Sequence, residues 1–140
     1  MAKYEIADAL QVEYQAIYAF GVAGAMLSGG LLDAALVAES RHREQRDAVV
    51  AHLRDTKATV PGAKPAYVLP FEVTGSAEAV KLITEIEDEV TMAWRAAVAN
   101  TFGDARRVAV TAYTQNAVNA ARWRRAQGES PSTVAYPGRP

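Results

Sequence analysis

Four long segments of this chain repeat apolar residues at alternating spacings of three and four, and this pattern limits the possible folds more than any other feature. The spacing places apolar side chains on one face of an α-helix, because a helix has about 3.6 residues per turn. We expect helices at about residues 4–27, 31–56, 75–101 and 104–127, followed by a tail at 128–140. Their apolar faces are expected to pack against one another in a single domain spanning residues 1–140.

The connections between these segments differ in length and predict the topology. Gly29-Gly30 and Gly103 mark short turns after the first and third segments, because glycine after an apolar run is typical of a helix end. Residues 57–73 contain three prolines, which exclude a regular helix there. Two helical hairpins joined by one long crossover form the connection pattern of ferritin-like bundles. We therefore predict an all-α fold, an antiparallel four-helix bundle that is ferritin-like, with a long crossover between helices 2 and 3.

Composition and charge exclude several classes of protein. The chain contains no cysteine, which excludes disulfides, thiolate metal ligands and thiol nucleophiles. Its 15 Lys and Arg nearly balance its 16 Asp and Glu, so a nucleic-acid partner is not expected. Residues 14–32 carry no charge, but their paired glycines indicate a helix that ends in a turn rather than a membrane span. Glu5 and Asp8 stand where a secretory signal would be apolar, so we expect a cytoplasmic protein without membrane association.

Polar residues interrupt the apolar faces near the middle of each expected helix, and these positions are the candidate functional site. Each lies at a similar distance from a hairpin turn, so at about 1.5 Å rise per residue they are expected to share the middle of the bundle. They are, in chain order, Glu13, Glu39, His42, Arg46, Glu87, Asn116 and Asn119.

Carboxylates and an imidazole that converge from facing helices are the ligands with which bundles bind iron or manganese. The motif Glu39-x-x-His42 places two such ligands on one helix face, while Glu13 and Glu87 supply one carboxylate each. These four residues are therefore a candidate site for one iron or manganese ion. A complete two-metal site needs a second Glu-x-x-His on the fourth helix, where the chain has two asparagines instead. Because amides are weak neutral ligands, we do not expect a two-metal centre.

A buried polar network accounts for the same residues without a metal. An unpaired buried carboxylate costs several kcal/mol, so each of these acids needs a partner. Arg46 lies one helical turn beyond His42, and its guanidinium is expected to neutralise Glu39 or Glu13, with the two asparagines of the fourth helix completing the network. We expect this network, and hence no cofactor; a bound iron or manganese ion is the alternative.

Trp94 and Trp123 lie at apolar positions of the third and fourth helices. We expect both side chains to be core anchors that need one hydrogen-bond partner each, because a buried indole N–H is costly when it has no acceptor.

Several runs of sequence resemble a known family. They are Glu13-Tyr-Gln-Ala-Ile-Tyr-Ala-Phe-Gly-Val-Ala-Gly-Ala, His42-Arg-Glu-Gln-Arg-Asp, Pro65-Ala-Tyr-Val-Leu-Pro-Phe, Glu87-Asp-Glu-Val-Thr-Met-Ala-Trp-Arg and the tail Pro131-Ser-Thr-Val-Ala-Tyr-Pro-Gly. Over nearly its whole length the chain resembles the alanine-rich, actinobacterial ferritin-like family of unknown function. The resemblance implies the ferritin-like fold and brings no established activity.

These features favour a non-catalytic binding or scaffold protein with a buried polar centre. The alternative is a metalloprotein that binds one iron or manganese ion and has oxidase or ferroxidase-type chemistry. No catalytic residue is predicted. A homodimer is the expected assembly, because bundles of this size often pair through faces of small residues such as Gly21 and Gly24.

Overall fold

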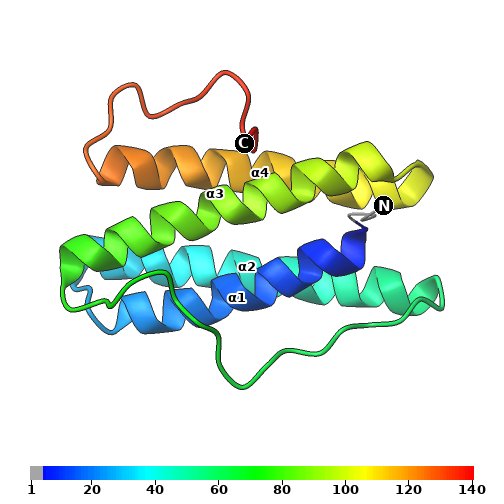
Figure 1. Cartoon of the computed structure of the whole chain (residues 1–140), viewed down its shortest axis with the longest axis horizontal. Coiled ribbons are helices and arrows are strands. Elements are labelled where there is room, and N and C mark those ends of the chain that lie inside the picture. Colours follow the sequence, from blue (N-terminus) through cyan, green and yellow to red (C-terminus); the bar gives the residue numbers. More distant parts are fainter. Residues whose placement is uncertain (1–4) are drawn as a thin grey trace.

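The computed structural model describes residues 5–140, in which four long α-helices lie side by side (Figure 1). The helices are α1 Ile6–Gly24, α2 Gly29–Asp55, α3 Ser76–Asn100 and α4 Gly103–Ala126. The described part of the chain contains no strand. The all-α bundle that the apolar spacing predicts is therefore confirmed. None of the helices between residues 5 and 140 is both long and apolar enough to cross a membrane.

The helices form two antiparallel hairpins, α1 with α2 and α3 with α4 (Figure 1). The segment from residue 56 to residue 75 returns along the length of the bundle, so that α3 begins at the same end as α2. This is the long crossover predicted from the prolines. Tyr14 fixes it to α1, because its hydroxyl donates a 2.9 Å hydrogen bond to the carbonyl oxygen of Pro61.

The helix boundaries differ from the expected ones mainly at the first hairpin. The expected start of the first helix at Tyr4 lies outside the described residues, and α1 ends at Gly24 rather than at residue 27. The reason is the start of α2: Ser28 is extended and Gly29 has a φ of +57°, a left-handed conformation that favours glycine. Residues 25–27 therefore belong to the connection between α1 and α2. The other boundaries lie within two residues of those expected, as is usual for helix ends.

Three pairs of helices pack closely, and one pair does not. Alanines on the buried face of α1, among them Ala9, Ala16 and Ala19, allow α2 and α3 to approach it. The centre of the core is filled by larger side chains, including Leu10, Phe20, Leu82, Ile83 and Trp94. By contrast, α2 and α4 make few contacts with each other. This difference leaves an open groove along one side of the bundle.

The C-terminal tail lies along the outside of the second hairpin (Figure 1). The buried guanidinium of Arg124 donates to the carbonyl oxygen of Ser132 over 2.7 Å and pairs with Asp88 of α3 over 2.5 Å. The hydroxyl of Tyr113 donates a 2.7 Å hydrogen bond to the carbonyl oxygen of Pro137. The tail is thus held to the second hairpin at two positions, Ser132 and Pro137.

Candidate functional site

The interior of the bundle contains a carboxylate–imidazole–carboxylate cluster, here called the buried centre, formed by Glu13 of α1, His42 of α2 and Glu87 of α3. Nδ1 of His42 lies 2.7 Å from Oε2 of Glu13, and Nε2 lies 2.5 Å from Oε1 of Glu87. Glu13 and Glu87 are 0% exposed and His42 is 2% exposed, so solvent does not reach the cluster. One imidazole therefore links three helices through two short hydrogen bonds.

The two carboxylates of the buried centre are not equally satisfied. Oε1 of Glu13 accepts hydrogen bonds from Nε2 of Gln45 and, over 2.7 Å, from the indole Nε1 of Trp94. Oε2 of Glu87 is buried and has no hydrogen-bond partner among residues 5–140. Glu13 therefore has three hydrogen-bond partners, whereas Glu87 depends on His42 alone.

The charge of His42 follows from its two neighbours. Burial lowers the pKa of the imidazole, but the negative charge of Glu87 and the hydrogen bonds to both carboxylates outweigh burial and raise this pKa from 6.5 to about 10. Burial raises the pKa of Glu87, against the opposing effect of His42. At neutral pH His42 is thus an imidazolium, and it supplies the positive charge that the buried acids require.

The structure brings together three of the four residues predicted to bind a metal, and it moves two predicted residues out of the interior. Glu13, His42 and Glu87 meet as expected. Glu39 instead pairs with Arg43 over 2.9 Å near the surface, and Arg46 pairs with its exposed neighbour Asp47 over 2.9 Å. The expectation that Arg46 neutralises Glu13 or Glu39 was therefore wrong.

The reason for this correction is the rotational phase of α2. Its inward face runs through Ala35, Ala38, His42, Gln45 and Val49. The sequence prediction placed Glu39 and Arg46 on that face, whereas the residues that face inward are the preceding ones, Ala38 and Gln45. A shift of one residue turns a side chain by about 100° around the helix. His42 belongs to both alternatives, so its position was correct in either phase.

Asn116 and Asn119 are buried, at 1% and 6% exposure, but neither joins the buried centre. Nδ2 of Asn116 donates to the carbonyl oxygen of Ala112 in its own helix. Oδ1 of Asn119 accepts a 3.3 Å hydrogen bond from Nη1 of Arg41 on α2. Their inward position was predicted correctly, and their membership of one network with the glutamates was not.

Two further side chains complete the buried centre. Trp94 was predicted to be a core anchor with one hydrogen-bond partner, and Glu13 is that partner. Gln45 was not identified from the sequence, although it lies one turn beyond His42 on the same face of α2. Its position three residues after His42 was the feature of the sequence that could have indicated an inward side chain.

The buried centre does not present a preformed metal site. Among residues 5–140 no group of three His, Asp or Glu side chains is arranged to bind a metal ion. Both ring nitrogens of His42 contact carboxylates on opposite sides of the ring, so neither is free to be a ligand while both hydrogen bonds persist. Only Oε2 of Glu87 is an uncommitted donor atom.

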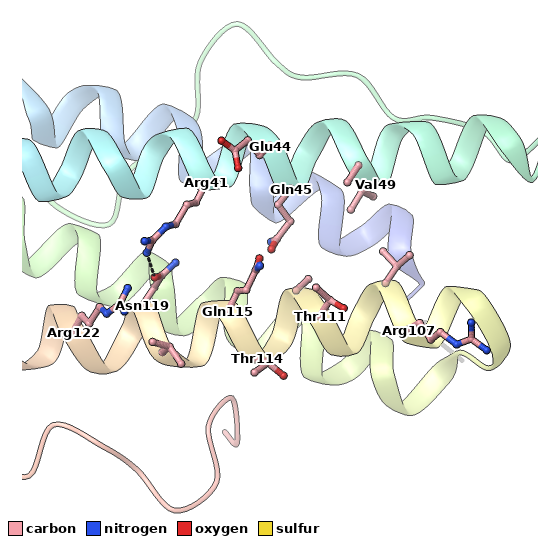
Figure 2. A pocket seen from close by; sticks show the side chains of 14 residues that line it. Arg41, Glu44, Gln45, Val49, Arg107, Thr111, Thr114, Gln115, Asn119 and Arg122 are labelled. Atoms are coloured by element: carbon pink, nitrogen blue, oxygen red, sulfur yellow. Dashed lines mark hydrogen bonds between the residues drawn. The ribbon is translucent and has the colours of Figure 1, made fainter.

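A second feature lies between α2 and α4, where the two helices separate. Here side chains from both helices line a groove of about 770 Å³, called the α2–α4 groove (Figure 2). Its buried floor includes Val49 and Ala112, and its rim carries Arg41, Arg107 and Arg122. The volume lies within the range of about 300–1,000 Å³ that is typical of small-molecule sites.

The Arg41–Asn119 hydrogen bond crosses the groove from α2 to α4 (Figure 2). A smaller cavity of about 320 Å³ lies beside it and shares Arg41, Asn119 and Arg122 as lining residues. In the larger cavity, the amides of Gln45 and Gln115 point toward each other from the two helices (Figure 2). Gln45 therefore touches the buried centre on one side and the groove on the other.

Comparisons with known proteins place the fold in a wider context. The family model described as "Domain of unknown function (DUF4439)" matches residues 6–140. The crystal structure of a conserved hypothetical protein, rv2844, from Mycobacterium tuberculosis is similar to this chain, with a TM-score of 0.84 and 38% sequence identity. The similarity covers 94% of each chain. A comparison with curated proteins found no match.

Proposed function

This chain belongs to the family described as Domain of unknown function (DUF4439), and from that premise we propose that it is a ferritin-like binding protein whose ligand site is the α2–α4 groove. In this proposal the buried centre is structural, and no catalytic step occurs there. Hairpin, crossover and hairpin follow one another in the order found in ferritin-like bundles, which supports that part of the proposal.

One observation carries the proposal: the reactive side chains are sealed, and the accessible space lies elsewhere. Glu13 and Glu87 are fully buried, and neither they nor His42 line the groove. A general acid or base must lie within hydrogen-bond reach of its substrate. The groove, by contrast, is open to solvent and combines an apolar floor with polar side chains from both helices.

The proposal is tested with a neutral apolar dye, Nile red, whose fluorescence rises when it enters an apolar site. We expect wild type to bind the dye and Thr111→Trp to bind it at least tenfold more weakly, because Thr111 is an exposed residue that lines the groove. Val110→Trp is the matched control, since Val110 is exposed on the same helix but does not line the groove. Equal dye binding by all three proteins, or none by wild type, would refute the groove as the ligand site.

A metalloprotein that holds one iron or manganese ion is the second candidate, and one observation favours it. The buried, unpartnered Oε2 of Glu87 is the kind of atom that a cation could satisfy. The occupied ring of His42 and the outward position of Glu39 oppose it. Metal analysis of protein purified without chelator, followed by ferrous titration of wild type and His42→Ala, distinguishes the two. Near-stoichiometric metal that is lost in His42→Ala would favour this candidate over the structural centre.

The expected homodimer is compatible with a ligand in the groove. No residue of α1 lines the groove, and Gly21 of α1 is exposed with open space around it. Two copies paired through this face would leave both grooves accessible. Light scattering of wild type and Gly21→Arg measures this: we expect a dimer for wild type and a monomer for the variant.

A further inference from the structure

The groove contains an imbalance of charge that identifies the chemistry of its ligand. We infer that the α2–α4 groove binds a medium-chain fatty acid, with Arg41 and Arg122 holding the carboxylate and the apolar floor holding the chain. This inference rests on the proposed function, because it names the class of ligand for the same groove.

Two guanidiniums flank one end of the groove, one from each helix (Figure 2). Arg41 and Arg122 are both exposed, and neither forms an ion pair with any residue from 5 to 140. Arginine remains protonated at any physiological pH, so both positive charges persist. Arg107, the third arginine that lines the groove, differs from them because it pairs with Asp104 over 3.3 Å. Among the described residues that line the groove, three guanidiniums therefore face the single carboxylate of Glu44, and two of the three, on facing helices, form no ion pair.

The present partner of Arg41 is one that an anion can replace. Nη1 of Arg41 donates to the neutral amide oxygen of Asn119 over 3.3 Å, which is longer than most hydrogen bonds of this type. A carboxylate accepts shorter, charge-assisted and often bidentate hydrogen bonds from arginine. An incoming carboxylate is thus expected to take Arg41 from Asn119 and to gain Arg122, which lines the same cavity.

The apolar part of the remaining lining favours an amphipathic anion over a purely polar one. Beyond the arginines, the floor continues along α4 to Val108 through the buried Ala112, with Val49 opposite on α2. Val108 lies roughly 16 Å from Asn119 along the helix axis, at about 1.5 Å per residue, which is of the order of an extended dodecyl chain. Inorganic phosphate would leave these apolar groups in water, whereas an acyl chain would cover them.

The same charges disfavour two other occupants. A second copy packed groove to groove around a two-fold axis would bring arginines toward arginines, and like charges across an interface are unfavourable. A nucleic acid would meet an apolar floor and only a few cations on a chain whose net charge is -1. A single-chain carboxylate matches both the cations and the apolar floor.

Calorimetric titration with sodium dodecanoate, below the concentration at which it forms micelles, tests this inference on the full chain. We expect wild type to bind dodecanoate, the double variant Arg41→Gln/Arg122→Gln to bind it at least fivefold more weakly, and neutral 1-dodecanol to bind wild type at least fivefold more weakly. Arg125→Gln is the matched control, because Arg125 is an exposed arginine of α4 outside the groove and its loss should leave affinity unchanged.

A loss smaller than fivefold in the double variant, or equal binding of dodecanoate and dodecanol, overturns the assignment of a fatty acid. The result for Nile red then separates the two levels. If Nile red still enters the groove, the proposed function stands and only the ligand class fails; if it does not, both fail. A dimer in which dodecanoate binding disappears as dimers form would show that a second copy covers the groove, which also overturns the inference.

Discussion

Nε2 of His42 lies 2.5 Å from Oε1 of Glu87, and this contact joins two helices that lie diagonally across the bundle. The other ring nitrogen contacts Glu13, so the same imidazolium also reaches α1. A single buried cation therefore sets the relative positions of α1, α2 and α3. The open α2–α4 side lies outside this cross-link, which is consistent with a ligand site placed there.

Removal of His42 tests its contribution to stability. His42→Ala leaves two buried carboxylates without their counter-charge, and breaking a buried pair in this way costs about 3–5 kcal/mol. Arg46→Ala is the comparison, because its partly exposed ion pair with Asp47 is worth at most about 1 kcal/mol. Both free energies of unfolding are measured by urea denaturation. If Arg46→Ala lowers the free energy of unfolding more than His42→Ala does, Arg46 rather than His42 is the buried counter-charge.

The indole of Trp94 is expected to contribute through its hydrogen bond as well as through its packing. Trp94→Phe removes the donor to Glu13, and a hydrogen bond to a charged group is worth about 1.5–3 kcal/mol beyond the lost volume. Trp123→Phe is the matched control, since this tryptophan is buried on α4 and its indole donates no hydrogen bond to Glu13, His42 or Glu87. Equal destabilisation of the two variants in chemical denaturation would show that the bond to Glu13 adds nothing.

Stability should fall as pH rises from about 6.5 to about 10. The pKa of His42 is raised in the folded protein, so its contribution is complete below pH 6.5, where the unfolded chain also holds the proton, and is lost as pH approaches 10. Burial also raises the pKa of Glu87, which changes stability in the same direction. The slope can reach about 1.4 kcal/mol per pH unit for one proton.

Urea denaturation at pH 6.5, 8 and 9.5 measures this slope. His42→Gln should remove most of it, while replacement of the other histidine, His52→Gln, should retain it. A wild-type stability that is constant or rises over this range is incompatible with a protonated His42.

The C-terminal tail should detach when a side chain is added at Gly138, where the tail packs against α3. A Cβ at Gly138 would lie 2.8 Å from the carbonyl oxygen of Thr91, and its φ of +73° is itself unfavourable for alanine. We expect Gly138→Ala to increase hydrogen exchange and proteolysis of residues 129–140 while the four helices remain protected. Gly62→Ala is the control, because nothing lies near that position. Unchanged exchange of the tail in Gly138→Ala would show that this contact does not hold it.

The apolar spacing was sufficient to predict the four helices and the crossover, because helix periodicity depends on the order of the residues alone. It was also sufficient for Glu13 and Glu87, each of which fills a gap between strongly apolar neighbours, and for His42, which faces inward in either phase of its helix. Helix α2 was harder, since the alanine-rich segment from Ala34 to Ala38 offers two possible inward faces and hydrophobicity does not decide between them. Packing against the other helices decides between the two faces. As a result Ala38 and Gln45 point inward, and Glu39 and Arg46 do not.

The groove could not be predicted from any single helix. Arg41 and Arg122 are 81 positions apart, and each alone is an ordinary exposed charge on a helix. Both line one groove only because α2 and α4 lie next to each other without packing closely. Likewise, the protonation of His42 depends on two carboxylates from other helices, which no local sequence pattern specifies.

The protonation state of His42 can be observed directly by nitrogen-15 NMR of the imidazole side chains. If His42 is the cation that links three helices, both of its ring nitrogens will remain protonated from pH 6 to about pH 9 in the folded protein. An imidazole that loses its proton near pH 6.5, as in an unfolded chain, would contradict this description of the buried centre.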